Sequence, residues 1–349
     1  MCVMAAYAGS EPAAAILLRM IEAQEGLDAG HYSGIATLHE GRIHLAKVCG
    51  SVARLRTETE AEKLPGVVGI AHSRTPGLPL QALAHPFLAS CGKVVYCANG
   101  SAGRFKEDLS GQRIYDLLTG ARRTFSSEQC FAVGSYPLLR NGHSVHRSDL
   151  LGGLVAHLHA AGDPLLLAMR NAFSQAPSEI AALALSVQEP GQVSGLRFNQ
   201  PLMLGRKDGA FYLATSALAF IPEDIDWVSP VPAATTLSMT AGNIHLRPMD
   251  VFPELLQAQP MTTAVTARLD HLFADGKAYR LSELRTELRG LWPEDKVQQA
   301  SMYAYEYLRE KILAGELERL AETVPASLTG DQAPLTKLQK KQPAHNSQH

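Results

Sequence analysis

Short β-rich segments dominate the first 250 residues, and they constrain the fold more than any other feature of this sequence. Nine segments rich in Val, Ile, Tyr and Leu are bounded by Gly, Pro, Asn or Ser, as β-strands are. They cover residues 3–7, 32–38, 42–48, 67–71, 94–98, 181–187, 202–204, 211–215 and 243–246. Helical periodicity is found at 13–23, 149–160 and 164–173. Because strands and helices do not alternate strictly, the pattern predicts a layered α+β domain over residues 2–250 and not a Rossmann sheet.

The composition changes after residue 250. Amphipathic helices are predicted at 264–273, 281–288 and 296–314. We therefore expect a small helical module over residues 255–322, in which the order of helices faintly resembles a winged helix. A polar tail over residues 327–349 is expected to be disordered.

The charges of the expected module bear on its partner. Two arginines of the segment 281–291 are matched by two glutamates, so this segment presents no net positive face. Such a surface attracts phosphate weakly, and nucleic acid is not the expected partner. An apolar stripe instead suits packing on the rest of the chain or on another protein, and it is formed by Tyr303, Tyr307, Leu308 and Leu313.

Composition restricts the class of protein. The chain of 349 residues has 32 Lys and Arg against 34 Asp and Glu, a net charge of −2, and 46% hydrophobic residues, which is typical of a globular protein. No apolar run approaches the roughly 20 residues that cross a membrane. Five cysteines without a C-x-x-C pair favour reduced thiols and a cytoplasmic location. No ligand spacing implies a metal or an organic cofactor.

Cys2 directly follows the initiator methionine. Removal of Met1 would leave a chain that begins with a thiol and its own α-amine. An α-amine has an unperturbed pKa of about 7.7–8.0, so it can accept the thiol proton near neutral pH. Nucleophile and base would then belong to one residue, although an N-terminal cysteine without any function is the commoner case.

A series of motifs follows Cys2 in a fixed order. They are Gly69-Ile70-Ala71-His72-Ser73-Arg74, Ala84-His85-Pro86, Cys97-Ala98-Asn99-Gly100 and Ser148-Asp149, followed by Gln200-Pro201-Leu202 and Leu213-Ala214-Thr215. Together they resemble the glutaminase domain of class II glutamine amidotransferases, most closely that of glucosamine-6-phosphate synthase. The resemblance covers about residues 2 to 250 and nothing after them.

The resemblance implies a role for five residues. Cys2 would be the nucleophile with its amine as general base, and Asn99 with Gly100 would form the oxyanion hole. Arg74 would bind the α-carboxylate of glutamine, for which a guanidinium fork is suited, and Asp149 would bind the α-ammonium. The implied fold is a four-layer αββα N-terminal-nucleophile hydrolase. The implied reaction is hydrolysis of the glutamine amide through a glutamyl thioester, without a cofactor.

The residues after 250 are too few for the sugar-isomerase domains of glucosamine-6-phosphate synthase. A separate synthase subunit that accepts the ammonia is therefore implied, and self-association into a homo-oligomer stays open. The family's Cys-Gly-Ile start is Cys2-Val3-Met4 here, and Thr75-Pro76 replaces the aromatic residue after the arginine. The segment after Arg74 is also shorter than in the family, which puts its geometry for binding glutamine in question.

Each motif has a simpler interpretation. Asn99-Gly100 also fits a hairpin turn, Arg74 a solvated charge, and Asp149 a helix N-cap. His72 and His85 fit structural histidines better than catalytic ones. Two alternative functions follow from these interpretations. One is an amidase of the same class that acts on a γ-glutamyl or acyl amide, and the other is a non-catalytic protein that binds glutamine or a partner.

Overall fold

The computed structural model describes residues 2–27, 29–105, 110–225, 227–252, 262–292, 297–326 and 332–341. Residues 2–252, which we call the main domain, contain two antiparallel sheets that pack face to face. The first has the order β11 (Trp227–Pro230), β9 (Met203–Lys207), β10 (Ala210–Ala214), β1 (Val3–Ala8), β4 (Val68–Arg74), β2 (Tyr32–His39), β3 (Arg42–Val48). The second has the order β13 (Asn243–Pro248), β12 (Thr235–Thr240), β8 (Val193–Arg197), β7 (Glu179–Ser186), β6 (Val94–Ser101), β5 (Phe87–Leu88).

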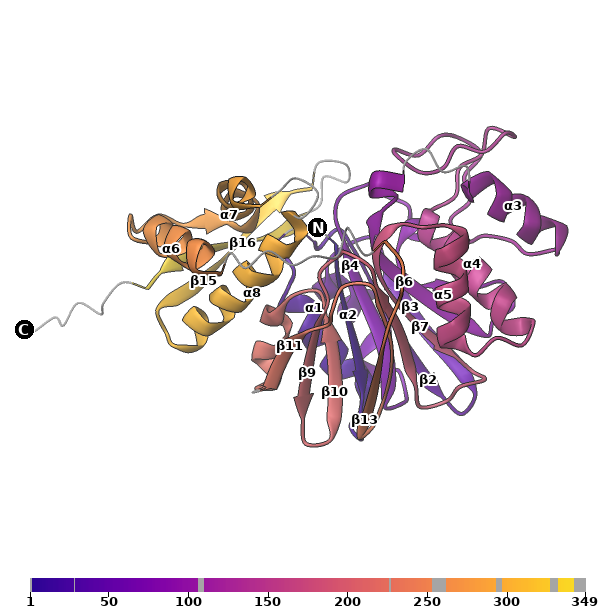
Figure 1. The fold of residues 1–349 in the computed structure, drawn as a ribbon, viewed down its shortest axis with the longest axis horizontal. Coiled ribbons are helices and arrows are strands. Elements are labelled where there is room, and N and C mark those ends of the chain that lie inside the picture. The colour runs from indigo at the N-terminus through magenta and orange to yellow at the C-terminus, as the bar shows by residue number, and fades with distance from the viewer. Residues whose placement is uncertain are drawn as a thin grey trace, which may run out of the picture.

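Helices cover the outer face of each sheet (Figure 1). The first sheet carries α1 (Ala13–Glu22), α2 (Val52–Glu58) and the 3-10 segments η1 (Ala61–Lys63) and η4 (Ala217–Glu223). The second carries α3 (Ser110–Gly120), α4 (Arg147–Ala160) and α5 (Leu165–Gln175), and short 3-10 turns lie at η2 (Gln81–Leu83) and η3 (Gly103–Phe105). The predicted four-layer αββα arrangement is confirmed.

Alternating side chains of the central strands fill the space between the two sheets. Met4 and Ile70 of the first sheet and Leu183 and Leu237 of the second are fully buried there. Their neighbours along each strand point to the helical layers, so both faces of these strands are apolar. This explains why the strands appear in the sequence as short continuous hydrophobic runs.

Residues 262–341, which we call the C-terminal module, contain strands in addition to the expected helices. They form α6 (Thr262–Phe273), β14 (Tyr279–Arg280), α7 (Leu281–Leu288), η6 (Arg289–Leu291), α8 (Val297–Leu313), β15 (Leu317–Pro325) and β16 (Gln332–Lys340). The strands form a sheet in the order β14-β16-β15, which together with the helices gives the element order of a winged helix.

The prediction of disorder after residue 327 is wrong for the segment Gln332–Lys340, which forms β16. Ala333, Thr336 and Leu338 of this strand are buried at intervals of two or three residues, although the segment is polar overall. A strand that buries only one side needs few apolar residues. In this segment those few residues alternate with Lys and Gln, so the sequence does not show a clear strand pattern.

The C-terminal module and the main domain share one hydrophobic core. Leu308 and Tyr305 of α8 pack against η4, beside α1 and the first sheet. Arg197 of β8 donates to Sδ of Met302 at 2.9 Å, which ties α8 to the second sheet as well. The stripe predicted on α8 is therefore largely occupied within the chain, and Leu313 at its end stays 54% exposed.

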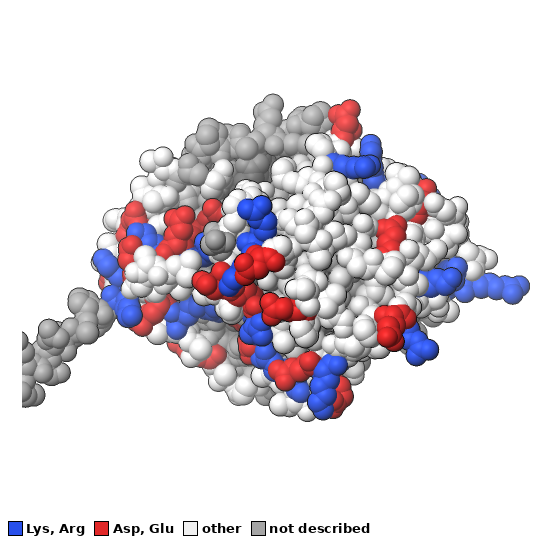
Figure 2. Space-filling view, turned by 90° about the horizontal axis from the view of Figure 1, so that it is seen from below, with Lys and Arg blue, Asp and Glu red and all other residues white. Residues whose placement is uncertain are grey.

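Positive and negative side chains are interspersed on the face shown in Figure 2. Pairs such as Arg56 with Glu22 and Arg19 with Glu223 bring opposite charges together at the surface of the first sheet's helical layer. Within the described ranges, no helix is long and apolar enough to cross a bilayer.

Candidate active site

A cavity of about 440 Å³ lies at one end of the two sheets. Cys2, Arg74 and Gly100, which belong to three different segments of the sequence, all line it. The structure therefore brings together three of the five residues singled out from the sequence. Tyr136 and His146, from a stretch that has no clear periodicity, complete its wall.

Strand pairing positions Cys2 beside Arg74. In the antiparallel ladder between β1 and β4, Val3 lies opposite Ser73, so the residue before β1 falls next to the last residue of β4. Cys2 is half-buried, and its Sγ lies 3.5 Å from Oγ1 of Thr75. The hydroxyl at position 75, where the family has an aromatic residue, thus contacts the candidate nucleophile.

Two tyrosine rings hold the guanidinium of Arg74. Its Cζ lies 4.9 Å from the ring centre of Tyr32 and 5.6 Å from that of Tyr136, both within the range of cation–π contacts. Its Nη1 donates to the carbonyl oxygen of Leu83 at 3.1 Å. The fork is therefore fixed in place before any ligand binds, which reduces the entropy cost of binding a carboxylate.

Gly100 has a backbone conformation that requires glycine. Its φ is +111°, and a Cβ atom at this position would lie 2.0 Å from the carbonyl oxygen of Glu179. Asn99, the residue before it, is 1% exposed and does not line the cavity. Its Nδ2 donates to Oγ1 of Thr215 at 2.7 Å. The two residues are adjacent to the cavity, but the side chain of Asn99 is engaged elsewhere.

Three histidines form a cluster, of which His85 and His146 line the cavity while His72 lies buried behind them. The ring centres of His72 and His85 are 4.1 Å apart, and that of His146 lies 4.7 Å from His85. Burial lowers the pKa of His72 to about 3, and burial also lowers the pKa values of His85 and His146 well below the usual range. All three rings are therefore neutral at pH 7, so they add no positive charge beside Arg74.

Asp149 lies away from the cavity. Its carboxylate accepts hydrogen bonds from the backbone N–H of Ser127 at 2.8 Å, from the Ser127 hydroxyl at 2.9 Å and from the Ser126 hydroxyl at 3.3 Å. Burial raises its pKa. It is not the N-cap of α4 either, because His146 holds that position and accepts from the backbone of Ser148.

A second buried carboxylate, which sequence reasoning missed, lies behind Arg74. Glu25 accepts from the hydroxyls of Ser33 at 2.9 Å and Ser73 at 2.8 Å and from the backbone N–H of Val52 at 3.0 Å. Burial raises its pKa to about 7. Since Ser73 precedes Arg74 on β4, this network supports the strand end that carries the guanidinium.

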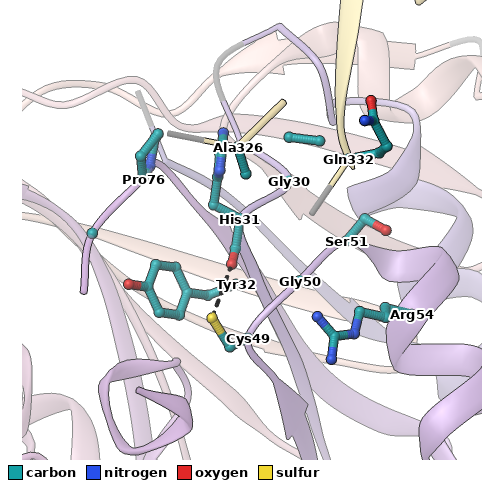
Figure 3. Close-up of a pocket in the computed structure, with 12 residues that line it drawn as sticks. Gly30, His31, Tyr32, Cys49, Gly50, Ser51, Arg54, Pro76, Ala326 and Gln332 are labelled. Atoms are coloured by element: carbon teal, nitrogen blue, oxygen red, sulfur yellow. Dashed lines mark hydrogen bonds between the residues drawn. The ribbon is translucent and has the colours of Figure 1, made fainter. Parts of the chain in front are cut away.

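The C-terminal module contacts the segment that carries Glu25. The backbone N–H of Thr336 on β16 donates to the carbonyl oxygen of Gly26 at 2.9 Å, and its hydroxyl donates to the carbonyl oxygen of Glu25 at 3.1 Å. A small pocket beside this contact is lined by Tyr32, Cys49 and Pro76 of the main domain and by Gln332 of β16 (Figure 3). The segment after Arg74 therefore lies between the cavity and the C-terminal module.

Sequence reasoning missed Tyr136 and His146 because they lie in a stretch that was not assigned to any element. The only available signal was their residue type, an aromatic and a histidine close to Asp149. Within the described part of the chain, no three His, Cys, Asp or Glu side chains are placed to hold a metal ion.

Comparison with known proteins finds similar sequences and similar folds. No family model matches the sequence. The glutamine–fructose-6-phosphate aminotransferase of Rhizobium leguminosarum is 28% identical over 263 residues, which cover 72% of this chain and 39% of the relative. That of Zymomonas mobilis is 31% identical over 215 residues, covering 56% and 30%. The chain is therefore similar to class II glutamine amidotransferases, which are enzymes.

Solved structures of amidotransferases share the fold. The glutamine phosphoribosylpyrophosphate amidotransferase of B. subtilis aligns over 83% of this chain and 64% of its own length, with a TM-score of 0.58 and 13% identity. An allosteric regulatory enzyme of purine biosynthesis aligns over 72% of this chain and 49% of its own, with a TM-score of 0.56 and 15% identity. The chain spans two fifths or less of the length of the curated relatives it matches.

Proposed function

We propose that this chain is a glutaminase that hydrolyses the side-chain amide of glutamine with Cys2 as its nucleophile. The observation that carries the proposal is the meeting of Cys2, Arg74 and Gly100 at one cavity between two sheets. These residues come from the ends of three strands, and they belong to the motifs on which the resemblance to class II glutamine amidotransferases rests. The proposal requires removal of Met1, because the base is the α-amine of Cys2.

The proposed reaction has two halves. The Cys2 α-amine takes the thiol proton, the thiolate attacks the amide carbon, and the carbonyl oxygen becomes an oxyanion. The protonated amine then gives its proton to the leaving nitrogen, and ammonia departs as the thioester forms. Water, deprotonated by the same amine, attacks the thioester and releases glutamate. The backbone N–H of Gly100 and the amide of Asn99 are the proposed donors to the oxyanion.

Recognition of the substrate rests on Arg74. Its guanidinium is fixed by Tyr32, Tyr136 and the carbonyl oxygen of Leu83, so it can meet a carboxylate with both arms of the fork. The histidines beside Arg74 are neutral, so they neither add to nor cancel the positive charge of its guanidinium. A substrate that carries a carboxylate near its amide therefore fits this end of the cavity.

The ammonia needs an acceptor. The relatives that match the chain are named as aminotransferases of fructose 6-phosphate, and they are more than twice as long as the part that aligns. We propose that a separate synthase subunit uses the ammonia. We also propose a cytoplasmic location for the protein.

The position of Asp149 favours a second candidate, an amide substrate that has a carboxylate but no α-ammonium. The hydroxyls of Ser126 and Ser127 already donate hydrogen bonds to the Asp149 carboxylate. Among the described residues that line the cavity, none is an Asp or a Glu. Glutaramate has the chain of glutamine without its α-amino group, so it discriminates between the candidates. Glutamine specificity predicts much faster hydrolysis of glutamine, and the second candidate predicts equal rates.

Labelling and mass spectrometry test the nucleophile. A glutamine-analogue electrophile is expected to add to Cys2 alone, and intact mass should show a chain without Met1. Cys2→Ala should abolish ammonia release, whereas Cys130→Ala, at an exposed cysteine far along the chain, should retain it. Labelling of Cys130 with Cys2 untouched would contradict the proposal.

A further inference from the structure

The side-chain amide of Asn99 is held by a buried hydroxyl. Oγ1 of Thr215 lies 2.7 Å from Nδ2 of Asn99 and also accepts the backbone N–H of Met4 at 2.9 Å. Thr215 is fully buried, and its own N–H donates to the carbonyl oxygen of Met4 at 3.1 Å. Thr215 thus connects β1, two residues from Cys2, with the end of β6.

The hydrogen bonds of this group do not balance with the amide placed in this way. Oγ1 of Thr215 accepts two hydrogen bonds, but no acceptor is recorded for its hydroxyl proton. Oδ1 of Asn99 is buried without a partner. A donor without an acceptor and an acceptor without a donor therefore lie beside each other, which native structures avoid.

Turning the amide of Asn99 by half a turn gives both groups a partner, and the NH₂ then faces the neutral ring of His72, whose unprotonated nitrogen can accept from it. The oxygen and nitrogen of an amide have nearly the same size, and the hydrogen-bond network decides which is which. With Oδ1 facing Thr215, the hydroxyl donates to Oδ1 while it still accepts from Met4. The amide NH₂ has two N–H groups, and neither is then used by Thr215, so both remain for other acceptors.

We infer that Thr215 is a positioning residue, whose hydroxyl donates to Oδ1 of Asn99 and so directs Nδ2 of Asn99 to the oxyanion of the tetrahedral intermediate. The inference rests on the proposed function, since it needs Asn99 as an oxyanion donor. A methyl group in place of the hydroxyl would leave Oδ1 without a donor, and the amide would lose its orientation. A serine would keep the hydroxyl and with it the orientation.

Ammonia release by the full chain, measured over a range of glutamine concentrations, tests the inference. Loss of one oxyanion donor lowers kcat by about 10²–10³, so Thr215→Val, which only misplaces the donor, should lower kcat by about tenfold or more. KM should stay within about twofold, because the oxyanion exists only in the transition state. Thr215→Ser should keep most of the activity.

A double variant separates positioning from general damage. If Thr215 acts through Asn99, then Thr215→Val should lower kcat by less than about twofold in a protein that already carries Asn99→Ala. Thr37→Val is the matched control, because this hydroxyl is buried in the same sheet without a partner and should be dispensable. Equal losses in both backgrounds, a change in KM alone, or a Thr215→Ser variant as slow as Thr215→Val would overturn the inference.

Two further measurements keep the inference testable. If Thr215→Val does not fold, Thr215→Cys provides a near-isosteric side chain with a weaker donor, and the same non-additivity with Asn99→Ala is expected. If the wild-type chain releases no ammonia, the proposed function has failed, and a neutron structure of the full chain then decides the orientation. A deuteron between Oγ1 of Thr215 and Oδ1 of Asn99 supports the inference, and an amide deuteron there overturns it.

Discussion

Glu25 and Asp149 are buried carboxylates in two regions of the main domain, and each is held by two serine side chains and one backbone N–H. The regions differ in what surrounds them. The one around Glu25 is completed by Thr336 of the C-terminal module, whereas the one around Asp149 is built within the main domain. A carboxylate that occupies the position expected from a sequence motif is therefore not a substrate ligand for that reason alone. Hydrogen bonds within the protein can already use its oxygens, as they do in both residues.

Shortening the chain to residues 1–252 should have the largest effect. It removes Leu308 and Tyr305 from the shared core, and burial of these two side chains alone stabilises by about 3–6 kcal/mol. Hydrogen exchange should rise first in residues 24–33 and only later in residues 144–158. A shortened chain that melts like the full chain, with residues 24–33 protected, would contradict the dependence on the C-terminal module.

Glu25→Ala and Asp149→Ala should each destabilise the fold strongly. Asp149→Ala leaves three donors without their acceptor, and Glu25→Ala leaves two, because the hydroxyl of Ser33 can still donate to the carbonyl oxygen of Gly50. The cost is roughly 1–3 kcal/mol for each donor. The variants should differ in KM. Glu25→Ala should raise KM for glutamine several-fold because Ser73 precedes Arg74, whereas Asp149→Ala should leave it unchanged. A rise in KM with Asp149→Asn, which preserves the shape, would instead make Asp149 a substrate ligand.

The pH dependence of stability should identify Glu25. Burial raises its pKa from 4.5 to about 7, so between these values the folded chain keeps a proton that the unfolded chain releases. The contribution of Glu25 to the free energy of unfolding should therefore fall as pH rises through this window, by up to roughly 3 kcal/mol. The buried histidines act in the opposite direction but equally in both proteins, so the stability of the wild type relative to Glu25→Gln should fall between pH 5 and pH 7.5 in thermal melts. Equal pH dependence in both would contradict the assignment.

Thr336→Val should have the smallest effect. It removes the hydroxyl bond to the carbonyl oxygen of Glu25 but keeps the backbone bond to Gly26, so we expect a loss of about 1 kcal/mol in chemical denaturation. Thr323→Val on β15 is the control, because that threonine is exposed. An equal loss in both variants would mean that the contact with Glu25 contributes nothing.

Local patterns in the sequence were sufficient to predict a layered α+β domain, whereas the four-layer αββα arrangement was predicted from the resemblance to class II glutamine amidotransferases. The strands that include Val3, Ile70 and Val95 have apolar side chains on both faces, and such runs are visible without tertiary information. The ends of β4 and β6, with Arg74 and Gly100, could be located from their motifs. Both residues line the cavity in the structure.

Contacts between distant residues could not be predicted in the same way. Asn99 meets Thr215 across 116 positions, and Glu25 meets Thr336 across 311. No periodic pattern or motif spacing in the sequence indicates either contact. Only the packing of the two sheets and of the C-terminal module brings these residues together. Tyr136 was missed for the same reason, since its position beside Arg74 depends on an irregular segment.

The contact between Thr336 and the segment at Glu25 also sets an order of events during synthesis. Cys2 and Arg74 leave the ribosome early, but the strand that closes the network behind Arg74 is translated about 260 residues later. The arginine end of the cavity therefore reaches its final form only after β16 has emerged and docked. Under the proposed function, a nascent chain would gain its full activity toward glutamine only after β16 has been synthesised and has docked.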